Sequence, residues 1–216
     1  MPNKNYNILV TGSNGQLGSE IKELSKEYSY NFFFTNRTNI DITSKENIKD
    51  FCQTNNINVI INCAAYTAVD KAESDEINAD LINRKAVKKL SLVSKELNIK
   101  LIHISTDYVF DGRNFKPYCE EFQTNPQGIY GKTKLNGENE MRDINPKNSI
   151  IIRTSWVYSS FGNNFVKTML RLGREKESLG VIFDQIGTPT YARDLAKVIL
   201  DVIPKIINEK VEIYNY

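Results

Sequence analysis

The sequence of 216 residues is poor in the side chains that build metal centres and disulfide frameworks. It has a single histidine, His103, and three cysteines that lie far apart and form no C-x-x-C pair. A zinc site needs several Cys or His ligands, and a disulfide framework needs an even set of paired cysteines. We therefore expect neither a disulfide framework nor a zinc, His-Cys or multi-histidine centre, and we assign no metal ligand. His103 lies within the apolar run LIHIS, so we interpret it as a buried structural residue.

The sequence also lacks a dominant charge and a long apolar run. Its formal net charge is only +2, with 28 basic and 26 acidic residues, which gives no electrostatic reason to expect binding to nucleic acid or to an anionic membrane. No segment approaches the roughly 20 apolar residues of a membrane span, and the N-terminal stretch MPNKNYNILVTG has no long apolar signal region. These absences predict a soluble protein located in the cytoplasm.

Short apolar, β-rich runs alternate with longer segments of helical period along the whole chain. The predicted strands are 6–11, 30–35, 58–64, 100–106, 149–155, 180–183 and 211–215. The predicted helices are 17–28, 44–55, 75–97, 128–142, 162–176 and 191–203. Strands that are apolar almost throughout indicate a parallel sheet covered on both faces, and the regular alternation indicates a doubly wound α/β fold. We predict one Rossmann-like domain spanning residues 1–216.

The first predicted strand is followed by GSNGQLG, in which Gly12, Gly15 and Gly18 have the spacing G-x-x-G-x-x-G. In doubly wound sheets, ligands bind beyond the carboxyl ends of the strands. Glycines there allow a tight turn and a close approach of a pyrophosphate, and the helix that follows offers free N–H groups and the positive end of its dipole. The motif predicts a dinucleotide site, with a glycine-rich connection that binds nothing as the alternative.

The second predicted strand ends in TNRTNIDI, where the first acidic residue is Asp41. An NAD-specific site usually has a carboxylate close to the end of this strand, where it holds the adenosine ribose. Here the chain has Asn36 and Arg37 instead, and a neutral residue followed by a guanidinium suits the 2′-phosphate of NADPH. We predict NADPH as the preferred cofactor and NADH as the second choice; an ordinary polar loop is the alternative interpretation.

Tyr130 and Lys134 are four residues apart and therefore share one face of the predicted helix 128–142. This helix follows the strand 100–106, whose end carries Thr106 and Asp107. A phenol ordinarily has a pKa near 10, and a neighbouring ammonium and an oxidised nicotinamide both lower it. We expect Tyr130 to donate a proton to a carbonyl oxygen, Thr106 to hydrogen-bond that oxygen, and Lys134 to tune Tyr130 and hold the nicotinamide ribose.

Six phrases spread over the chain resemble the dTDP-4-dehydrorhamnose reductase family, within the extended short-chain dehydrogenase/reductase superfamily. They are GSNGQLG, NCAAYTAVDKAE, STDYVFDG, YGKTKLNGE, RTSWVYSSFGNNFVKTML and DQIGTPTYARDLA. The resemblance implies reduction of the 4-keto group of dTDP-4-dehydro-L-rhamnose by NADPH or NADH. It implies a dTDP-sugar as the substrate and leaves room for a homodimer.

The resemblance also implies roles for individual residues. Thr106, Tyr130 and Lys134 match the catalytic trio, and Thr106, Asp107 and Trp156 match sugar-contacting positions within a pocket to which residues 156–192 contribute. The predicted cofactor contacts are Gly12, Asn14, Gly15, Gln16, Leu17, Gly18, Asn36, Arg37, Asp41, Ile42, Ala64, Ala65, Tyr66, Tyr130 and Lys134. Asn163 and Asn164 precede FVKTML and are also candidates for a helix cap.

Members of this family continue beyond the final VEIYNY, so the resemblance implies that roughly a quarter of the usual length is absent and that the C-terminal substrate lobe is truncated. Two alternatives have the same architecture: a non-catalytic dinucleotide-binding regulatory protein, and an epimerase or dehydratase of a related sugar nucleotide. The intact set of Thr106, Tyr130 and Lys134 argues against the first. Asp107-Tyr108, in place of an acidic pair after the strand-end threonine, argues against a dehydratase.

Overall fold

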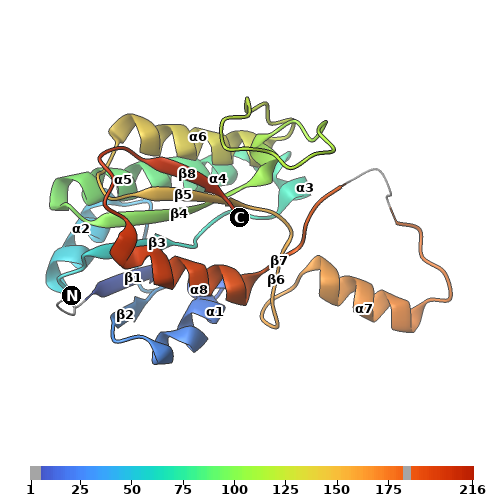
Figure 1. The fold of residues 1–216 in the computed structure, drawn as a ribbon, viewed down its shortest axis with the longest axis horizontal. Coiled ribbons are helices and arrows are strands. Elements are labelled where there is room, and N and C mark those ends of the chain that lie inside the picture. Colours follow the sequence, from blue (N-terminus) through green and yellow to red (C-terminus); the bar gives the residue numbers. More distant parts are fainter. Residues whose placement is uncertain (1–5, 182–185) are drawn as a thin grey trace.

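A computed structural model describes residues 6–181 and 186–216 and has a six-stranded parallel sheet at its centre (Figure 1). Each strand pairs in parallel with its neighbours. In spatial order the strands are β2 (Asn31–Phe34), β1 (Asn7–Thr11), β3 (Val59–Asn62), β4 (Lys100–Thr106), β5 (Ile150–Thr154) and β8 (Glu212–Asn215). This order, with helices between the strands, confirms the predicted doubly wound α/β fold.

Helices cover both faces of the sheet (Figure 1). On one face lie α1 (Gln16–Leu24) and α8 (Ala192–Val202), whose apolar residues pack with Ile8, Val10, Ile102 and Ile152 of the strands. On the other lie α2 (Lys45–Thr54), α5 (Ala86–Leu97) and α6 (Ile129–Ile144), which pack over Leu9, Ile60, Leu101 and Ile151. Burial on both sides explains why the central strands are apolar at successive positions.

The helices begin and end at residues suited to those positions. Ser44 caps α2 by accepting a hydrogen bond from the Asn47 N–H (3.2 Å). Asn98 and Asn145 end α5 and α6 in the left-handed conformation, with φ of 54° and 52°, which asparagine adopts more readily than most side chains. The bounds of each predicted helix lie within a few residues of those of an observed helical segment.

The predicted helix 75–97 consists of three segments in the structure. They are α4 (Glu76–Asp80), a π-helical stretch (Leu81–Lys85) and α5. The buried Asn83 in the π-helical stretch accepts a hydrogen bond from the Tyr66 N–H (2.9 Å) and donates to the Tyr66 carbonyl (3.1 Å). Gly137 of α6 lies against this stretch, because a Cβ at Gly137 would be 2.1 Å from the Asn83 carbonyl oxygen.

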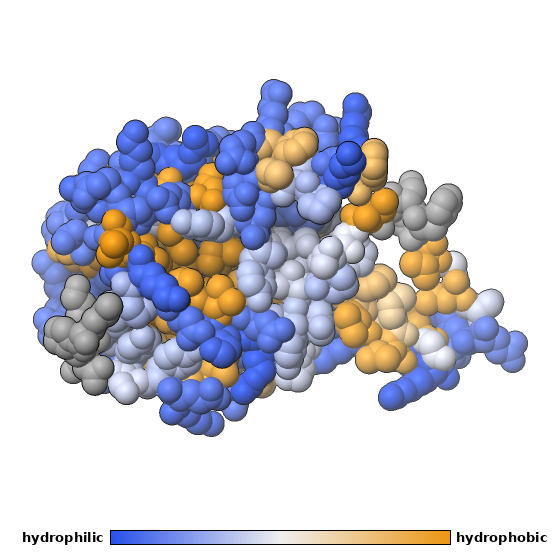
Figure 2. Space-filling model, viewed as in Figure 1, coloured by the Kyte–Doolittle hydropathy of each residue, from blue (hydrophilic) through white to orange (hydrophobic). Residues whose placement is uncertain are grey.

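The segment after β5 leaves the sheet and returns to it. It contains β6 (Val157–Tyr158), α7 (Phe165–Glu175) and β7 (Thr190–Tyr191), and β6 pairs in parallel with β7. The α7 helix stands apart from the sheet and its covering helices (Figure 1), and none of its residues is buried. Figure 2 shows apolar side chains gathered on this projecting part. The sequence did not predict β6 or β7, because each has only two residues.

Two further differences from the sequence predictions concern short segments. The helix α3 (Val69–Ala72) was not predicted. The predicted strand 180–183 is wrong for Gly180 and Val181, which belong to no strand; Val181 is exposed, and 182–183 lie outside the described residues. Within the part of the chain that the structure describes, no helix has the length and apolarity that crossing a membrane requires.

Candidate functional site

A cleft of about 1920 Å³ lies at the carboxyl ends of the central strands and extends to α7. Every site residue predicted from the sequence lines it. Those residues are Gly12, Asn14, Gly15, Gln16, Leu17, Gly18, Asn36, Arg37, Asp41, Ile42, Ala64, Ala65, Tyr66, Thr106, Asp107, Tyr130, Lys134 and Trp156. The structure therefore brings residues from the ends of β1, β2, β3, β4 and β5 to one opening.

The turn after β1 has the shape that a pyrophosphate requires. Gly12 has a φ of +64°, and a Cβ there would lie 2.7 Å from the Ala64 Cα at the end of β3. At Gly18 a Cβ would lie 2.6 Å from the Ser13 Cα. The first helical hydrogen bond of α1 runs from the Ser19 N–H to the Gly15 carbonyl, so the N–H groups of residues 16–18 have no partner in the helix. This bare cradle at a helix N-terminus fits the pyrophosphate of a dinucleotide.

The loop after β2 is held by its own side chains. The Asn36 Oδ1 accepts hydrogen bonds from the N–H and hydroxyl of Thr38 (2.8 and 2.6 Å). The Asp41 carboxylate accepts two hydrogen bonds from Thr43 in the same way, and the Thr43 hydroxyl is the largest cause of the lowered pKa of Asp41. Arg37 is exposed and lines the cleft. The guanidinium is thus available to a phosphate at this rim, whereas the Asn36 Oδ1 is already engaged by Thr38.

Thr106 and Tyr130 come together where β4 ends and α6 begins. The Thr106 Oγ1 donates to the Asp107 carboxylate (3.1 Å) and accepts from the Tyr108 N–H (3.2 Å), which fixes the backbone turn after the strand. The Tyr130 ring packs edge-on against the ring of Tyr108, with 5.5 Å between their centroids. Burial raises the pKa of Asp107. A hydroxyl, a phenol and a carboxyl group therefore surround one region of the cleft.

In the structure the pKa of Tyr130 lies above its usual value, opposite to the direction expected beside an ammonium and an oxidised nicotinamide. Burial raises this pKa to about 12, and the hydrogen bond to Thr106, which acts in the opposite direction, is the smaller effect. The Lys134 ammonium, which donates to the Ile104 carbonyl (2.6 Å), is not among the causes of the Tyr130 pKa shift in this structure. The phenol therefore keeps its proton at neutral pH, which is the state that a proton donor requires.

Lys134 is only 2% exposed. Burial lowers its pKa to about 8, and the negative charge of Glu138 partly opposes this change. Cys63, also at the cleft, has its pKa raised to about 12 by burial, so it stays a neutral thiol. Lys134 is thus a buried cation that loses its proton at a lower pH than an exposed lysine.

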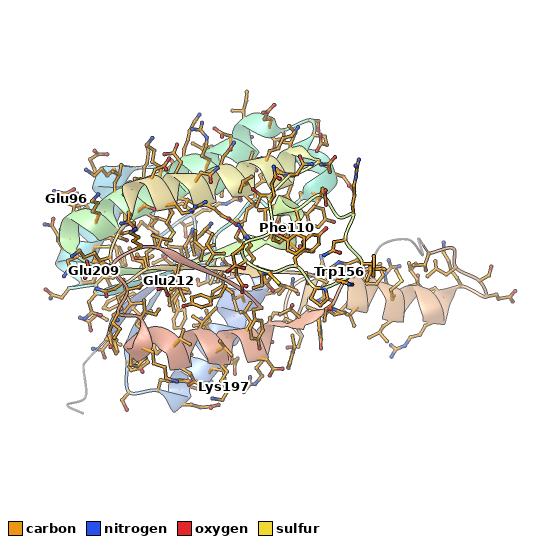
Figure 3. All side chains as sticks on the ribbon, turned by 45° about the horizontal axis from the view of Figure 1, so that its top comes forward. Glu96, Phe110, Trp156, Lys197, Glu209 and Glu212 are labelled. Carbon is orange, nitrogen blue, oxygen red and sulfur yellow. The ribbon has the colours of Figure 1, made fainter. Side chains whose placement is uncertain are left out.

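Sequence reasoning missed a buried ion pair between Arg153 of β5 and Glu138 of α6. The Arg153 Nη2 of β5 donates to the Glu138 Oε2 (2.7 Å) and its Nε donates to Oε1 (3.0 Å), while the Ser105 hydroxyl donates to the same carboxylate (2.5 Å). The Arg153 guanidinium lies 5.1 Å from the centroid of the Phe110 ring, which Figure 3 labels. A signal existed in the spacing, because Glu138 follows Lys134 by four residues, as Lys134 follows Tyr130.

His103 is fully buried, which confirms its interpretation as a structural residue. Its Nδ1 lies 3.0 Å from the Asn62 Nδ2, and the Thr11 hydroxyl donates to the Asn62 Oδ1 (2.6 Å). These three side chains occupy paired positions on β1, β3 and β4. Burial lowers the pKa of His103 well below its usual value, so the ring is neutral. Among the described residues no three His, Cys, Asp or Glu side chains are grouped so that they could hold a metal ion.

Trp156 forms the wall of the cleft nearest to α7 (Figure 3). Its ring meets that of Phe165 edge-on, with 5.0 Å between centroids, and its backbone has a φ of +48°. A Cβ at Gly187 would lie 2.6 Å from the Trp156 Nε1, so the indole needs a glycine beside it. Asn164, rather than Asn163, caps α7 by accepting a hydrogen bond from the Lys167 N–H (3.0 Å).

Comparison with known proteins places this architecture in a family. The family model described as "RmlD substrate binding domain" matches residues 6–216. The dTDP-4-dehydrorhamnose reductase of Aggregatibacter actinomycetemcomitans is 42% identical over 93% of this chain and 68% of its own length. That of Escherichia coli is 40% identical over 94% of this chain and 69% of its own.

Solved structures that resemble this chain carry the same enzyme name as these sequence relatives. A dTDP-4-dehydrorhamnose reductase from Clostridium acetobutylicum superposes with a TM-score of 0.91 and 43% identity over 97% of this chain and 73% of its own. The enzyme of the same name from Bacillus anthracis, solved in complex with NADP, gives a TM-score of 0.92 and 38% identity over 99% of this chain and 74% of its own. Fold, glycine turn and sequence likeness over nearly the whole chain agree: the chain belongs to the dTDP-4-dehydrorhamnose reductase family.

Proposed function

We propose that this chain reduces the 4-keto group of dTDP-4-dehydro-L-rhamnose to dTDP-L-rhamnose with NADPH. The observation that carries the proposal is the position of Thr106, Tyr130 and Lys134 at the cleft that the glycine turn also lines. The names of the relatives and the NADP bound by the Bacillus anthracis enzyme support the substrate and the cofactor.

The cofactor would be held along the cleft from the β2 end to α6. The N–H groups of the first turn of α1 suit its pyrophosphate, Arg37 suits a 2′-phosphate, and Lys134 suits the nicotinamide ribose. The remaining contacts that we propose are Gly12, Asn14, Gly15, Gln16, Leu17, Gly18, Asn36, Asp41, Ile42, Ala64, Ala65, Tyr66 and Tyr130. NADPH, when bound, supplies the hydride that reduces the carbonyl carbon.

Tyr130 is the proposed proton donor. With a pKa of about 12 its phenol is protonated at neutral pH, and it gives this proton to the carbonyl oxygen of the sugar as the negative charge develops there. The Thr106 hydroxyl donates a hydrogen bond to the same oxygen. In this structure the Lys134 ammonium donates to the Ile104 carbonyl; with the ligands bound it would stabilise the phenolate that remains after proton transfer, because an opposite charge nearby favours the ionised phenol.

On the sugar side, we propose that Asp107 and Trp156 contact the substrate together with Thr106. Asp107 follows the strand end directly, and Trp156 forms the wall toward α7. Residues 156–192 would then contribute part of the sugar-nucleotide pocket within a single dinucleotide-binding domain of residues 1–216. Assembly as a homodimer and a location in the cytoplasm stay predictions.

Replacing Tyr130 by phenylalanine tests the proposal. Tyr130→Phe keeps the ring and removes the proton, so we expect turnover to fall by about 10² to 10⁴ while NADPH binding stays near the wild-type value. The decay of nicotinamide absorbance with dTDP-4-dehydrorhamnose gives the turnover. Tyr28→Phe is the matched control, because the Tyr28 hydroxyl donates to Asp201 away from the cleft. The proposal is wrong if Tyr130→Phe keeps even half of the wild-type turnover.

A further inference from the structure

The side chain of Gln16 connects the glycine turn to the segment that carries α7. Gln16 is the first residue of α1. Its Nε2 donates to the Val157 carbonyl of β6 (3.2 Å), and its Oε1 accepts a hydrogen bond from the Asn164 Nδ2 (2.9 Å). Gly162 also approaches it closely, since a Cβ at Gly162 would lie 3.1 Å from the Gln16 Cγ. Residues separated by almost 150 positions thus meet at the start of α1.

The Asn164 side chain caps α7 with its oxygen and contacts Gln16 with its nitrogen. Its Oδ1 caps α7 by accepting from the Lys167 N–H (3.0 Å). Its Nδ2 donates to the Gln16 Oε1 and to the Ser159 carbonyl (2.8 Å). A single amide therefore fixes the start of α7 and ties that start to the turn where the dinucleotide pyrophosphate is proposed to bind.

A second contact, one helical turn along α1, supports the same connection. The Ser159 hydroxyl donates to the Glu20 Oε1 (2.6 Å), and Glu20 is 1% exposed. Gln16 and Glu20 are four residues apart and so lie on one face of α1. The loop that leads into α7 is therefore anchored on α1, whereas α7 itself has no buried residue that would fix it against the sheet.

We propose that Asn164 is a positioning residue that couples dinucleotide binding at the α1 turn to the orientation of α7 beside the sugar-nucleotide side of the cleft. This inference rests on the proposed function. A pyrophosphate bound to the first N–H groups of α1 immobilises Gln16, whose side chain then holds the α7 cap in one position. Apolar residues of α7 line the cleft, namely Phe165, Val166, Met169 and Leu170. The sugar nucleotide that binds after NADPH therefore contacts an α7 that is already ordered.

Coupling of this kind has a reciprocal signature, because each ligand must raise the affinity for the other by the same factor. We expect saturating NADPH to tighten the binding of dTDP, the probe for the sugar-nucleotide side, by about fivefold or more. We also expect NADPH alone to slow hydrogen exchange of the backbone amides of α7. Titration calorimetry and mass-detected hydrogen exchange measure these two effects.

The decisive variant is Asn164→Ser. Serine is a good helix cap, but its short hydroxyl cannot reach Gln16, so α7 is kept and the hydrogen bond between residue 164 and Gln16 is lost. The contacts of Gln16 with Val157 and of Ser159 with Glu20 remain. We expect the variant to bind NADPH nearly as well as the wild type while the effect of NADPH on dTDP affinity and on α7 exchange disappears. Arg171→Ala is the control, because it removes an exposed ion pair with Glu175 on the same helix and leaves the connection intact.

The outcomes separate this inference from the proposed function. Coupling that persists in Asn164→Ser, or is absent in a wild type that binds NADPH, overturns the inference and leaves the reductase proposal standing. A wild type that does not bind NADPH overturns both. If dTDP binds too weakly for calorimetry, α7 exchange alone decides. A melting temperature of Asn164→Ser close to that of Arg171→Ala shows that any loss of coupling does not arise from unfolding.

Discussion

Lys134 brings an ammonium group into a site where water hardly reaches it, with the Ile104 carbonyl as its hydrogen-bond acceptor. Its pKa is about 8 in the folded chain, against about 10.4 for a lysine in an unfolded chain. Between these two values the unfolded state binds a proton that the folded state does not, so stability rises with pH across that window. At neutral pH, burial of this charge therefore lowers the stability of the protein.

Lys134→Met removes the charge and keeps most of the volume. We expect its stability relative to the wild type to be highest near pH 7 and to decline by up to about 3 kcal/mol as the pH rises through 8 toward 10, at roughly 1.4 kcal/mol per pKa unit. Urea unfolding of both proteins at pH 7, 8.5 and 10 measures this difference. Lys132→Met, at an exposed neighbour on α6, should show no such trend. A difference that stays constant with pH would contradict the buried-charge account.

Arg37 decides the choice of cofactor in our interpretation. It is exposed at the rim of the cleft, and no carboxylate stands at the adjacent Asn36 to repel a 2′-phosphate. A charge-assisted contact contributes about 1.5–3 kcal/mol, so Arg37→Ala should weaken NADPH binding by about tenfold or more and leave NADH almost unchanged. Asn36→Asp should reverse the preference.

Dissociation constants for both cofactors at one low salt concentration test this prediction. Arg113→Ala, at another exposed arginine on a distant loop, should change neither constant. If the unmodified protein binds the two cofactors equally, and Arg37→Ala alters nothing, Arg37 does not read the phosphate.

At the scale of elements, we expect alanine substitutions at two helical glycines to have opposite effects on stability. Gly137 lets α6 pack against the π-helical stretch, where an added Cβ would meet the Asn83 carbonyl oxygen at 2.1 Å, whereas nothing lies within 4 Å of a Cβ at Gly173 in α7. Gly137→Ala should lower the free energy of unfolding by about 1–3 kcal/mol or more. Gly173→Ala should be neutral or gain up to about 1 kcal/mol from helix propensity. Thermal unfolding gives the melting temperatures of the two variants. Equal values would show that α6 can move away from the π-helical stretch without a loss of stability.

The elements that the sequence predicted are those whose burial follows a simple pattern. Six of the seven predicted strands are observed. The central ones were predictable because a strand covered on both faces is apolar at successive positions, as Val59–Asn62 largely is, whereas the edge strand β8 is only partly buried. The GVIF run at 180–183 has the same composition, yet Val181 is exposed, because composition does not specify whether a neighbouring strand exists.

The site residues were also predictable up to a limit. Parallel strands bring their carboxyl ends to one edge, so residues after β1, β2 and β4 had to meet. The direction of the Tyr130 pKa was not predictable, because it depends on how much of the phenol is buried and on where the Lys134 ammonium points. The contact between Gln16 and Asn164 was likewise hidden, since the two residues are distant in sequence and no local pattern relates them.

At the scale of the whole molecule, α7 and α8 are two helices of eleven residues in very different surroundings. Five residues of α8 are buried against the sheet face that also holds α1, and none of α7 is buried. Local opening is easiest where few apolar contacts must be broken. We expect amides of α7 to exchange with solvent orders of magnitude faster than those of α8 in the protein without ligand, as measured by hydrogen exchange. Equal protection of the two helices would mean that α7 packs against something in solution.

The arrangement of the sheet faces has a consequence for synthesis on the ribosome. The face formed by Ile102, Ile150 and Ile152 is covered by α8, which is made about 40 residues after β5 ends. At a translation rate of about 5–20 residues per second, this face stays uncovered for roughly 2 to 8 s between the synthesis of β5 and that of α8. During that interval the nascent chain presents an apolar surface next to α1 that only a late segment can close. Chaperones that bind exposed apolar surfaces would therefore act on this protein between the synthesis of β5 and that of α8.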